Sequence, residues 1–222
     1  SDVYKRQVHA TLACRWRKLA SGKWRCLHRV ICLVIDVSVH APVMVTEVIE
    51  KLLHRVQGTY LDATFGRGGH SRALLARLDA AARLIALDQD GEAIAHAEEL
   101  ANSEPRLAVY RGRFADMREI LSQLGVDQLD GVLMDVGVSS PQLDDPTRGF
   151  SFRHTAQLDM RMDQSQGETA AEWLNRAEVD EIVSVLRRHG EERYARRIAE
   201  SILAARPLST TTQLAELISA AV

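Results

Sequence analysis

An alternation of short apolar strands with short amphipathic helices, beginning near residue 59, is the feature that most restricts how this chain can fold. Strands are predicted at 60–63, 83–87, 107–110 and 132–135, and helices at 71–78, 92–100 and 116–124. Strands that alternate with helices of about ten residues form βαβ units. Such units build a parallel sheet with helices on both faces, so the sequence predicts an α/β fold.

The unusual residues of this region follow the ends of the predicted strands. Gly66, Gly68 and Gly69 come after the first strand, Asp88 ends the second, and Asp135 ends the fourth. In open parallel sheets, ligands bind beyond the carboxyl ends of the strands. The sequence therefore predicts a ligand site along this edge.

The glycine-rich turn and Asp88 together favour a cofactor that contains adenosine. Glycines let backbone N–H groups approach a ligand closely, and an acidic side chain after the next strand can accept hydrogen bonds from both ribose hydroxyls. The two features do not by themselves separate NAD from S-adenosylmethionine. The regular G-x-G-x-x-G pattern that suits a pyrophosphate is absent, which favours S-adenosylmethionine.

A change in composition near residue 37 divides the chain. Residues 1–37 carry eight Lys and Arg against two Asp and Glu, whereas residues 38–222 carry 20 against 28. We interpret residues 1–37 as a separate N-terminal extension to which we assign no function, and the opening residues favour a non-native or upstream-frame origin. Apolar runs are too short for a transmembrane helix, so no membrane partner is expected.

All three cysteines lie in this extension, at Cys14, Cys26 and Cys32, and their spacing fits no zinc site. No cluster of metal ligands is found elsewhere in the sequence, so no metal is expected. A body without cysteines needs no disulfides, which is typical of the cytoplasm.

After Asp135 the alternation stops. Residues 136–167 are rich in turn formers and charge, and the chain is predicted to be helical from 168 to its end. Tyr194, Ile198 and Ile202 form an amphipathic stripe, and Thr210 with Gln213 provides a cap for the last helix. With four predicted strands the sheet is incomplete, which indicates a fragment or an edge covered by the helical part.

Six strings, in this order, carry a resemblance to a known family: DATFGRGGHS, MDVGVSSPQLDD, RGFSF, LDMRMD, TAAEWLN and GEERYARRIA. From residue 40 to 222 the chain resembles the MraW/RsmH family of ribosomal RNA small-subunit methyltransferases. The resemblance implies a Rossmann-like sheet that binds S-adenosylmethionine, with a helical insertion domain. It also implies methylation of the N4 amine of a cytidine in 16S ribosomal RNA, with the small ribosomal subunit as partner. A homodimer is left open.

The resemblance places the family's cofactor contacts on matching positions of this chain. It implies contacts from Gly68, Gly69, His70, Asp88, Phe114, Asp135 and Gln142. Core packing of Phe114 is the alternative. The family pattern Asp-Arg-Asp-Pro is replaced here by Asp88-Gln89-Asp90-Gly91, which keeps the ribose-binding acid. The family chain continues beyond this one, so we expect a C-terminally truncated member.

We interpret residues 38–145 as the cofactor-binding domain and residues 146–222 as a helical domain for substrate recognition. The cytosine amine is a weak nucleophile, and hydrogen-bond acceptors aimed at its N–H groups would favour attack. Asp135 and Ser139 are the predicted catalytic acceptors.

Two segments are candidates for facing RNA, namely 148–163 and the helix that carries Arg193, Arg196 and Arg197. A solvated face paired with acids is the alternative for this helix. Residues 148–206 contain ten arginines and ten acids, so no basic field is expected. A NAD-dependent oxidoreductase and an inactive RNA-binding fragment stay open as other functions.

Overall fold

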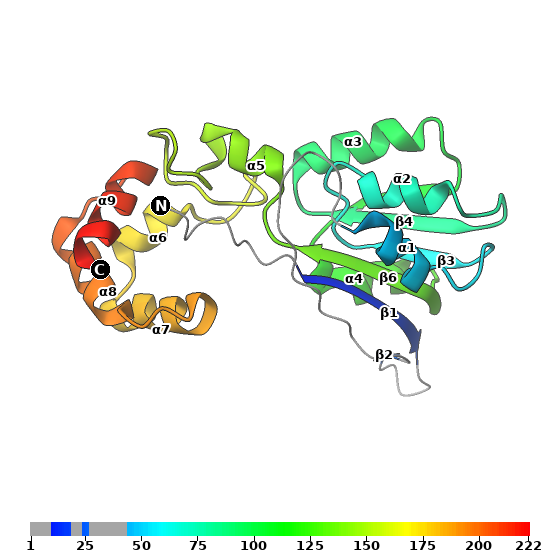
Figure 1. The fold of residues 1–222 in the computed structure, drawn as a ribbon, viewed down its shortest axis with the longest axis horizontal. Coiled ribbons are helices and arrows are strands. Elements are labelled where there is room, and N and C mark those ends of the chain that lie inside the picture. The colour runs from blue at the N-terminus through cyan, green and yellow to red at the C-terminus, as the bar shows by residue number, and fades with distance from the viewer. Residues whose placement is uncertain (1–9, 19–23, 27–43) are drawn as a thin grey trace. The chain divides into compact units, whose positions relative to one another are not determined.

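The computed structural model describes residues 10–18, 24–26 and 44–222 (Figure 1). The chain divides into two compact units, Ser1–Gly137 and Val138–Val222. The sequence analysis places the corresponding domain boundary later, between 145 and 146. Cys32 and residues 30–39, the longest candidate for an apolar run, lie outside the described residues.

A six-stranded sheet with the order β2-β1-β6-β3-β4-β5 forms the first unit. Four of its strands are parallel and correspond to the predicted ones: β3 (Thr59–Asp62), β4 (Arg83–Asp88), β5 (Leu107–Arg111) and β6 (Gln128–Val136). The predicted α/β class with a parallel sheet is confirmed.

Two further strands, β1 (Ala10–Lys18) and β2 (Trp24–Cys26), form an antiparallel pair at the end of the sheet. The backbone of β1 pairs with β6, so that Thr11 lies opposite Asp135. The alternation pattern did not predict these strands. Basic residues interrupt their apolar pattern, and pairing along a sheet edge uses backbone groups that any residue carries.

Helices cover both faces of the parallel strands, as Figure 1 shows. One face packs against α1 (Val45–Leu52), α2 (Gly69–Leu75) and α3 (Gly91–Ala101), through a core that includes Tyr60 and Leu84. The other face, which includes Leu61 and Ile85, packs against α4 (Met117–Gln123). Successive side chains of a strand point to opposite faces of the sheet. Because helices cover both faces, the side chains on both must be apolar, and each strand appears in the sequence as a continuous apolar run.

The helices differ in detail from their predicted bounds. The second helix of the unit ends at Leu75 rather than at 78, and α1 was not predicted. Asp116 has capping-box spacing with Glu119, yet its side chain caps nothing. Asp116 is the last residue of a 3₁₀ turn, η2 (Phe114–Asp116), which continues directly into α4. The backbone at Asp116 is therefore not the extended one that a helix-capping residue usually has.

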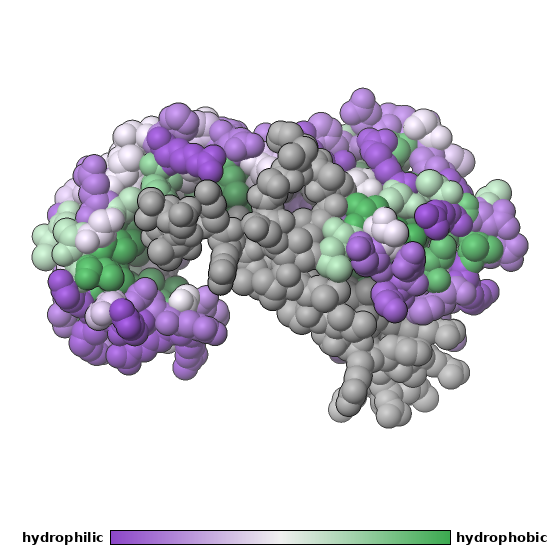
Figure 2. Space-filling view, viewed as in Figure 1, coloured by the Kyte–Doolittle hydropathy of each residue, from purple (hydrophilic) through white to green (hydrophobic). Residues whose placement is uncertain are grey.

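The second unit is helical, as predicted. It consists of α5 (Ser140–Asp144), the 3₁₀ turn η3 (Pro146–Arg148), α6 (Ala170–Arg176), α7 (Val179–Gly190), α8 (Ala195–Ala205) and α9 (Thr211–Ala221). Ile198 and Ile202 are buried in its core, and the predicted capping box of Thr210 and Gln213 is formed. The exposed side of α7 is mostly hydrophilic (Figure 2), with Val185 as an exposed apolar residue. Within the described part of the chain, no helix is long and apolar enough to cross a membrane.

Gly149 begins the long loop between η3 and α6 with a backbone conformation that favours glycine. Its φ is +72°, and a Cβ there would lie 2.6 Å from the Asp159 backbone nitrogen and 2.7 Å from the Gln157 carbonyl oxygen. Gly167 has a similar φ of +74°, but a Cβ there would meet nothing within 4 Å. A substitution at Gly167 would thus cause backbone strain alone, whereas a substitution at Gly149 would cause both strain and a steric clash.

We expect Gly167→Ala to lower the free energy of unfolding by about 1–2 kcal/mol, the cost of a left-handed backbone with a Cβ. Gly149→Ala should cost several kcal/mol in total, because two rigid backbone atoms must also move. Thermal and urea unfolding of both variants would measure the difference. Equal effects of the two substitutions would contradict the clash.

Candidate functional site

Polar residues converge at the carboxyl ends of β6, β3, β4 and β5, which are neighbours in the sheet. The turn 64–69 follows β3, Asp88 ends β4, Phe114 follows β5, and Asp135 lies near the end of β6. The predicted site residues of the first unit therefore share one edge, as expected for parallel strands.

The turn after β3 contains two glycines whose backbone lies in the left-handed region. Gly66 has a φ of +55° and Gly68 a φ of +74°, and a Cβ at Gly68 would overlap the Phe65 ring. The Phe65 N–H donates to the Leu87 carbonyl at 3.2 Å, which ties the turn to β4. A Cβ at Gly66 would meet nothing within 4 Å, so space is open beside this part of the turn.

The Asp88 carboxylate joins the turn to the start of α3. Its Oδ2 accepts the Gly66 N–H at 2.9 Å, and its Oδ1 accepts the Asp90 N–H at 3.0 Å. Burial raises the pKa of Asp88 above its usual range, although these hydrogen bonds oppose the shift. Each oxygen has a second lone pair, so the carboxylate can still accept hydrogen bonds from a diol.

Asp62 is a buried acid that the sequence analysis did not assign to the site. It is 1% exposed, and its carboxylate accepts the Ser71 hydroxyl at 2.6 Å and the Thr64 N–H at 3.2 Å. Burial raises the pKa of Asp62 to about 6, against these hydrogen bonds and the nearby charge of His70. The signal was present in the sequence: an acid that ends an apolar strand, directly before the glycine turn, must find partners when buried.

Thr64 links this cluster to the neighbouring strand. Its hydroxyl oxygen accepts the backbone N–H of Asp135 at 2.7 Å. The end of β6 is therefore fixed to the turn that follows β3, and the half-buried Asp135 side chain stands on a rigid backbone.

His70 and Phe114 occupy different environments. His70 is buried in the first turn of α2, between Gly69 and Ser71. Phe114 begins η2 and is 40% exposed, which excludes core packing as its main role. The backbone before it is tied to β4, because the Gly112 N–H donates to the Asp88 carbonyl at 2.8 Å. An exposed aromatic ring at the ligand edge of a sheet can stack on a flat ligand.

Ser139 and Gln142 belong to the second unit, where they form a reciprocal cap for α5. The Ser139 N–H donates to Gln142 Oε1 at 2.9 Å, and the Gln142 N–H donates to Ser139 Oγ at 3.4 Å. This contact gives both residues a role in the fold. The predicted roles of Ser139 as a catalytic acceptor and of Gln142 as a cofactor contact stay predictions.

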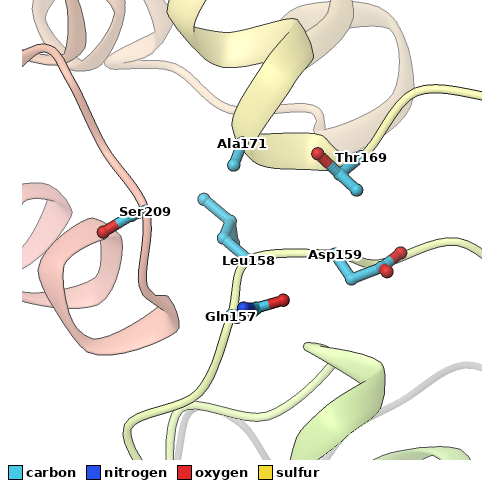
Figure 3. A pocket seen from close by; sticks show the side chains of 6 residues that line it. All are labelled: Gln157, Leu158, Asp159, Thr169, Ala171 and Ser209. Atoms are coloured by element: carbon cyan, nitrogen blue, oxygen red, sulfur yellow. The ribbon is translucent and has the colours of Figure 1, made fainter.

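A pocket of about 200 Å³ lies elsewhere, within the helical unit (Figure 3). It is lined by Gln157, Leu158, Asp159, Thr169, Ala171 and Ser209. This volume is below the roughly 300–1,000 Å³ of typical small-molecule sites. The pocket contains none of the residues at the strand ends, so we do not identify it with a cofactor site.

The parallel sheet with a glycine turn and an acid after successive strands places the first unit in the Rossmann-like class of folds that bind adenosine-containing cofactors. Comparison with known families narrows this class to the S-adenosylmethionine-dependent methyltransferases. The model of the MraW methylase family matches residues 37–222, and the chain belongs to this family.

Curated relatives agree with the family. The chain is 50% identical over 186 residues to a protein of Burkholderia cenocepacia, 53% over 186 residues to one of an Azoarcus species, and 49% over 183 residues to one of Acinetobacter baumannii. All three carry the name Ribosomal RNA small subunit methyltransferase H. The matches cover 81–82% of this chain and 59–60% of the relatives, so the chain spans about three fifths of their length.

Replacing Asp88 by Asn should weaken binding of S-adenosylmethionine roughly 10- to 100-fold, because an amide N–H₂ would face a backbone N–H and the ribose would lose a charged acceptor. Isothermal titration calorimetry of the variant and of the unchanged chain would measure this. Asp79→Asn is the matched control, since Asp79 is exposed and precedes β4 at the opposite edge of the sheet. Unchanged affinity in a folded Asp88→Asn chain would contradict the ribose contact.

The raised pKa of Asp62 makes a prediction about stability and pH. A carboxyl whose pKa is higher in the folded than in the unfolded chain stabilises the fold below its unfolded pKa of 3.8, and this contribution is lost as the pH rises through about 6. The difference between the two pKa values corresponds to on the order of 3 kcal/mol. Asp62→Asn does not titrate, so its stability relative to the unchanged chain should increase between pH 4 and pH 7.

Urea unfolding of both chains across this pH range would test the prediction for Asp62. Asp79→Asn is again the control, because Asp79 is exposed and accepts the Gln57 amide at 3.0 Å rather than lying in the core. A stability difference between the Asp62→Asn and unchanged chains that is constant with pH would show that Asp62 does not titrate in this range.

Proposed function

We propose that this chain uses S-adenosylmethionine to methylate the N4 amine of a cytidine in small-subunit ribosomal RNA. The observation that carries the proposal is the meeting of the glycine turn, Asp88, Phe114 and Asp135 at one sheet edge. Membership of the MraW methylase family and the names of the relatives support the methyl donor and the class of RNA.

The residues at this edge fit S-adenosylmethionine. Open space beside Gly66 suits a ligand that approaches the backbone closely, and the Asp88 carboxylate suits a ribose diol. The Phe114 ring is exposed where it can cover an adenine. When bound, the cofactor supplies a methyl group that its sulfonium centre activates toward nucleophiles. A G-x-G-x-x-G turn for the pyrophosphate of NAD is absent, which argues against an oxidoreductase.

The acceptor amine needs help from the protein, because its lone pair is delocalised into the cytosine ring. Holding the nitrogen in line with the methyl carbon supplies much of the catalysis. We assign to the Asp135 carboxylate the role of accepting an amine N–H, which favours a tetrahedral nitrogen and stabilises the developing positive charge. The hydrogen bond from the Asp135 N–H to Thr64 Oγ1 fixes the backbone that carries this carboxylate.

We propose cytidine N4 as the methylated atom because the six sequence strings resemble those of the MraW/RsmH family. A ribosomal RNA substrate also agrees with the cytoplasmic location predicted from the absence of cysteines in residues 38–222. Arg193 was predicted to lie on the candidate RNA-facing helix, but α8 begins at Ala195 and the Arg193 guanidinium lies 4.5 Å over the Tyr194 ring. Within α8, Arg196 pairs with Asp180 at 2.8 Å, so the RNA-facing prediction for this helix loses support. These contacts favour a solvated face for this helix.

Asp135→Asn should lower the rate of methyl transfer roughly 100-fold, because the charged acceptor for the amine is lost. The affinity for S-adenosylmethionine should change much less. Transfer of labelled methyl groups to small ribosomal subunits, with calorimetry of cofactor binding, would measure both. Asp79→Asn is the control for a lost carboxylate far from this edge. An unchanged rate of methyl transfer in a folded Asp135→Asn chain would show that Asp135 is not the acceptor.

A chain that folds but binds no adenosine ligand while binding RNA would favour the alternative of an RNA-binding fragment. Retention of NAD in preference to S-adenosylmethionine would favour an oxidoreductase. Calorimetry with both adenosine ligands, together with a measurement of RNA binding, therefore decides among the three functions before any assay of methylation is run.

A further inference from the structure

Two large apolar side chains of the helical unit are exposed on one loop. Phe152 is 48% exposed and Met160 is 46% exposed, and both lie between η3 and α6. We call residues 150–160 the presenting loop. Single exposed apolar residues are common on protein surfaces, so exposure alone does not define a contact surface. The backbone conformation of Met160 and the charge of the loop are the additional observations.

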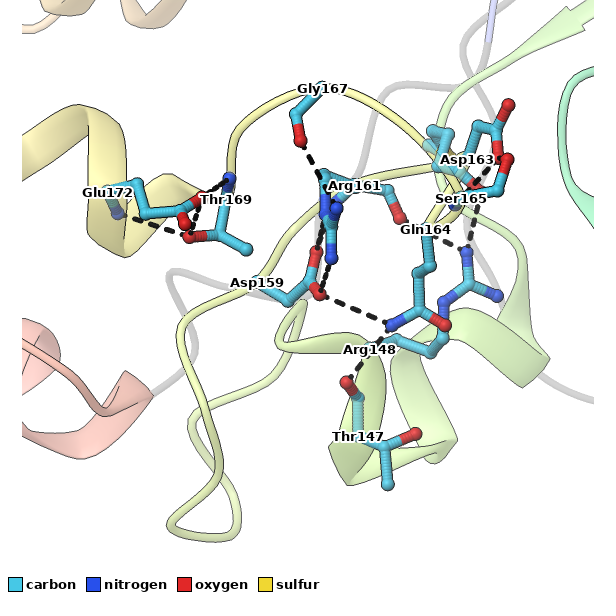
Figure 4. A network of polar contacts seen from close by, with 11 residues as sticks. Thr147, Arg148, Asp159, Arg161, Asp163, Gln164, Ser165, Gly167, Thr169 and Glu172 are labelled. Atoms are coloured by element: carbon cyan, nitrogen blue, oxygen red, sulfur yellow. Dashed lines mark hydrogen bonds and ion pairs between the residues drawn. The ribbon is translucent and has the colours of Figure 1, made fainter.

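Met160 has a backbone conformation that side chains rarely adopt, with a φ of +62°. Such a conformation costs free energy and persists only where neighbouring contacts impose it. Those contacts are present on both sides. Asp159 and Arg161 form a two-point ion pair at 2.8 Å each, and Arg148 donates to the carbonyl oxygens of Arg161 at 3.2 Å and Met162 at 2.9 Å (Figure 4).

The Met160 N–H also donates to the Arg148 carbonyl at 3.0 Å. Arg148 and Asp159 are buried, so this network is anchored in the interior of the unit, although the Arg161 side chain is a quarter exposed. The exposed Met160 side chain is therefore held in place by a rigid backbone. The free-energy cost of its left-handed conformation is not offset by burial of the side chain.

The part of the loop that follows Phe152 is held by hydrogen bonds to the first residue of α9, Thr211. The Thr211 hydroxyl donates to the His154 carbonyl at 3.0 Å and accepts the Ala156 N–H at 3.3 Å. Phe152 and the exposed Arg153 thus stand on an anchored backbone.

Arg153 of the presenting loop differs from several other arginines of the unit, which form ion pairs with acidic side chains. Arg161 pairs with Asp159, Arg176 with Glu168, and Arg196 with Asp180. Among the residues that the structure describes, no ion pair involves Arg153, and no acid lies between residues 149 and 158. An exposed aromatic ring beside an exposed guanidinium and an imidazole suits a phosphate backbone with accessible bases.

We propose that the presenting loop binds unpaired RNA, with Phe152 and Met160 against bases and Arg153 at a phosphate. This inference rests on the proposed function, in which the target base must leave its stack to be methylated. Aromatic rings stack on unpaired bases, and apolar side chains can insert at a base step and hold it open. A preorganised Met160 makes that contact without an additional ordering cost.

Two pairs of variants test the proposal in the full chain. Met160→Asn relieves the backbone strain, because Asn tolerates a positive φ, and removes the apolar side chain. Glu191→Asn is its matched control, since Glu191 is exposed in the same unit with a φ of +49°. Phe152→Ala removes the ring, and Val185→Ala removes an exposed apolar side chain of α7 as its control.

The readouts are thermal unfolding, calorimetry with S-adenosylmethionine, and fluorescence anisotropy with a labelled single-stranded RNA oligonucleotide and the corresponding duplex. Phe152→Ala should weaken binding of the single strand roughly tenfold, the usual loss for one stacked base. Met160→Asn should weaken it several-fold while the unfolding temperature stays the same or rises. The controls should leave RNA affinity within about twofold, a factor too small for the loss of a stacked base.

Unchanged RNA affinity in both Phe152→Ala and Met160→Asn would overturn the proposal, as would an equal loss in the two controls. A chain that binds S-adenosylmethionine but no RNA would also overturn it, and would leave the cofactor part of the proposed function standing. A chain that binds RNA but no S-adenosylmethionine would overturn the proposed function, and the variants would still decide the role of the loop.

Discussion

Parallel pairing of β3 with β4 and β6, covered by helices on both faces, is the constraint on which the first unit depends. Strands buried on both faces have no room for unpaired polar side chains. Polar chemistry is therefore displaced to the strand ends, where the chain leaves the sheet. Because the strands are parallel, these ends lie at one edge, and acids far apart in the sequence become neighbours there.

The same edge is stabilised by the groups that we assign to function. The carboxylates of Asp62 and Asp88 accept backbone and hydroxyl donors of the glycine turn and of the loops beside it. Desolvation raises the pKa of both acids, and their hydrogen bonds partly offset that cost. A site that is built from such bonds is preorganised, so a bound ligand orders few further residues.

The helical unit shows a different balance. Its core is formed by apolar side chains of α6 to α9, whereas the loop before α6 is held by Arg148, Asp159 and Arg161. These contacts maintain a left-handed residue at Met160 and a glycine-dependent turn at Gly149. Strain that is held by buried polar contacts and displayed at an exposed side chain is typical of functional loops rather than of packing.

Much of this architecture follows from the sequence alone. The parallel strands, the glycine turn, Asp88 at the end of β4 and the cap at Thr210 are local patterns, because apolar runs, turn residues and caps act over a few positions. The family resemblance also lies in contiguous strings, and the family match from residue 37 agrees with it.

Other features were decided only by the tertiary structure. The partners of Asp62, the bond from Asp135 to Thr64, the pairing of β1 with β6 and the exposure of Phe114 depend on residues that are distant in sequence. The left-handed Met160 likewise leaves no mark in composition or periodicity. The cap of Ser139 and Gln142, by contrast, has the same local spacing as Thr210 and Gln213 and was readable from the sequence. Burial and hydrogen bonding are properties of the packed chain, and side-chain identity specifies them only after the fold has brought the partners together.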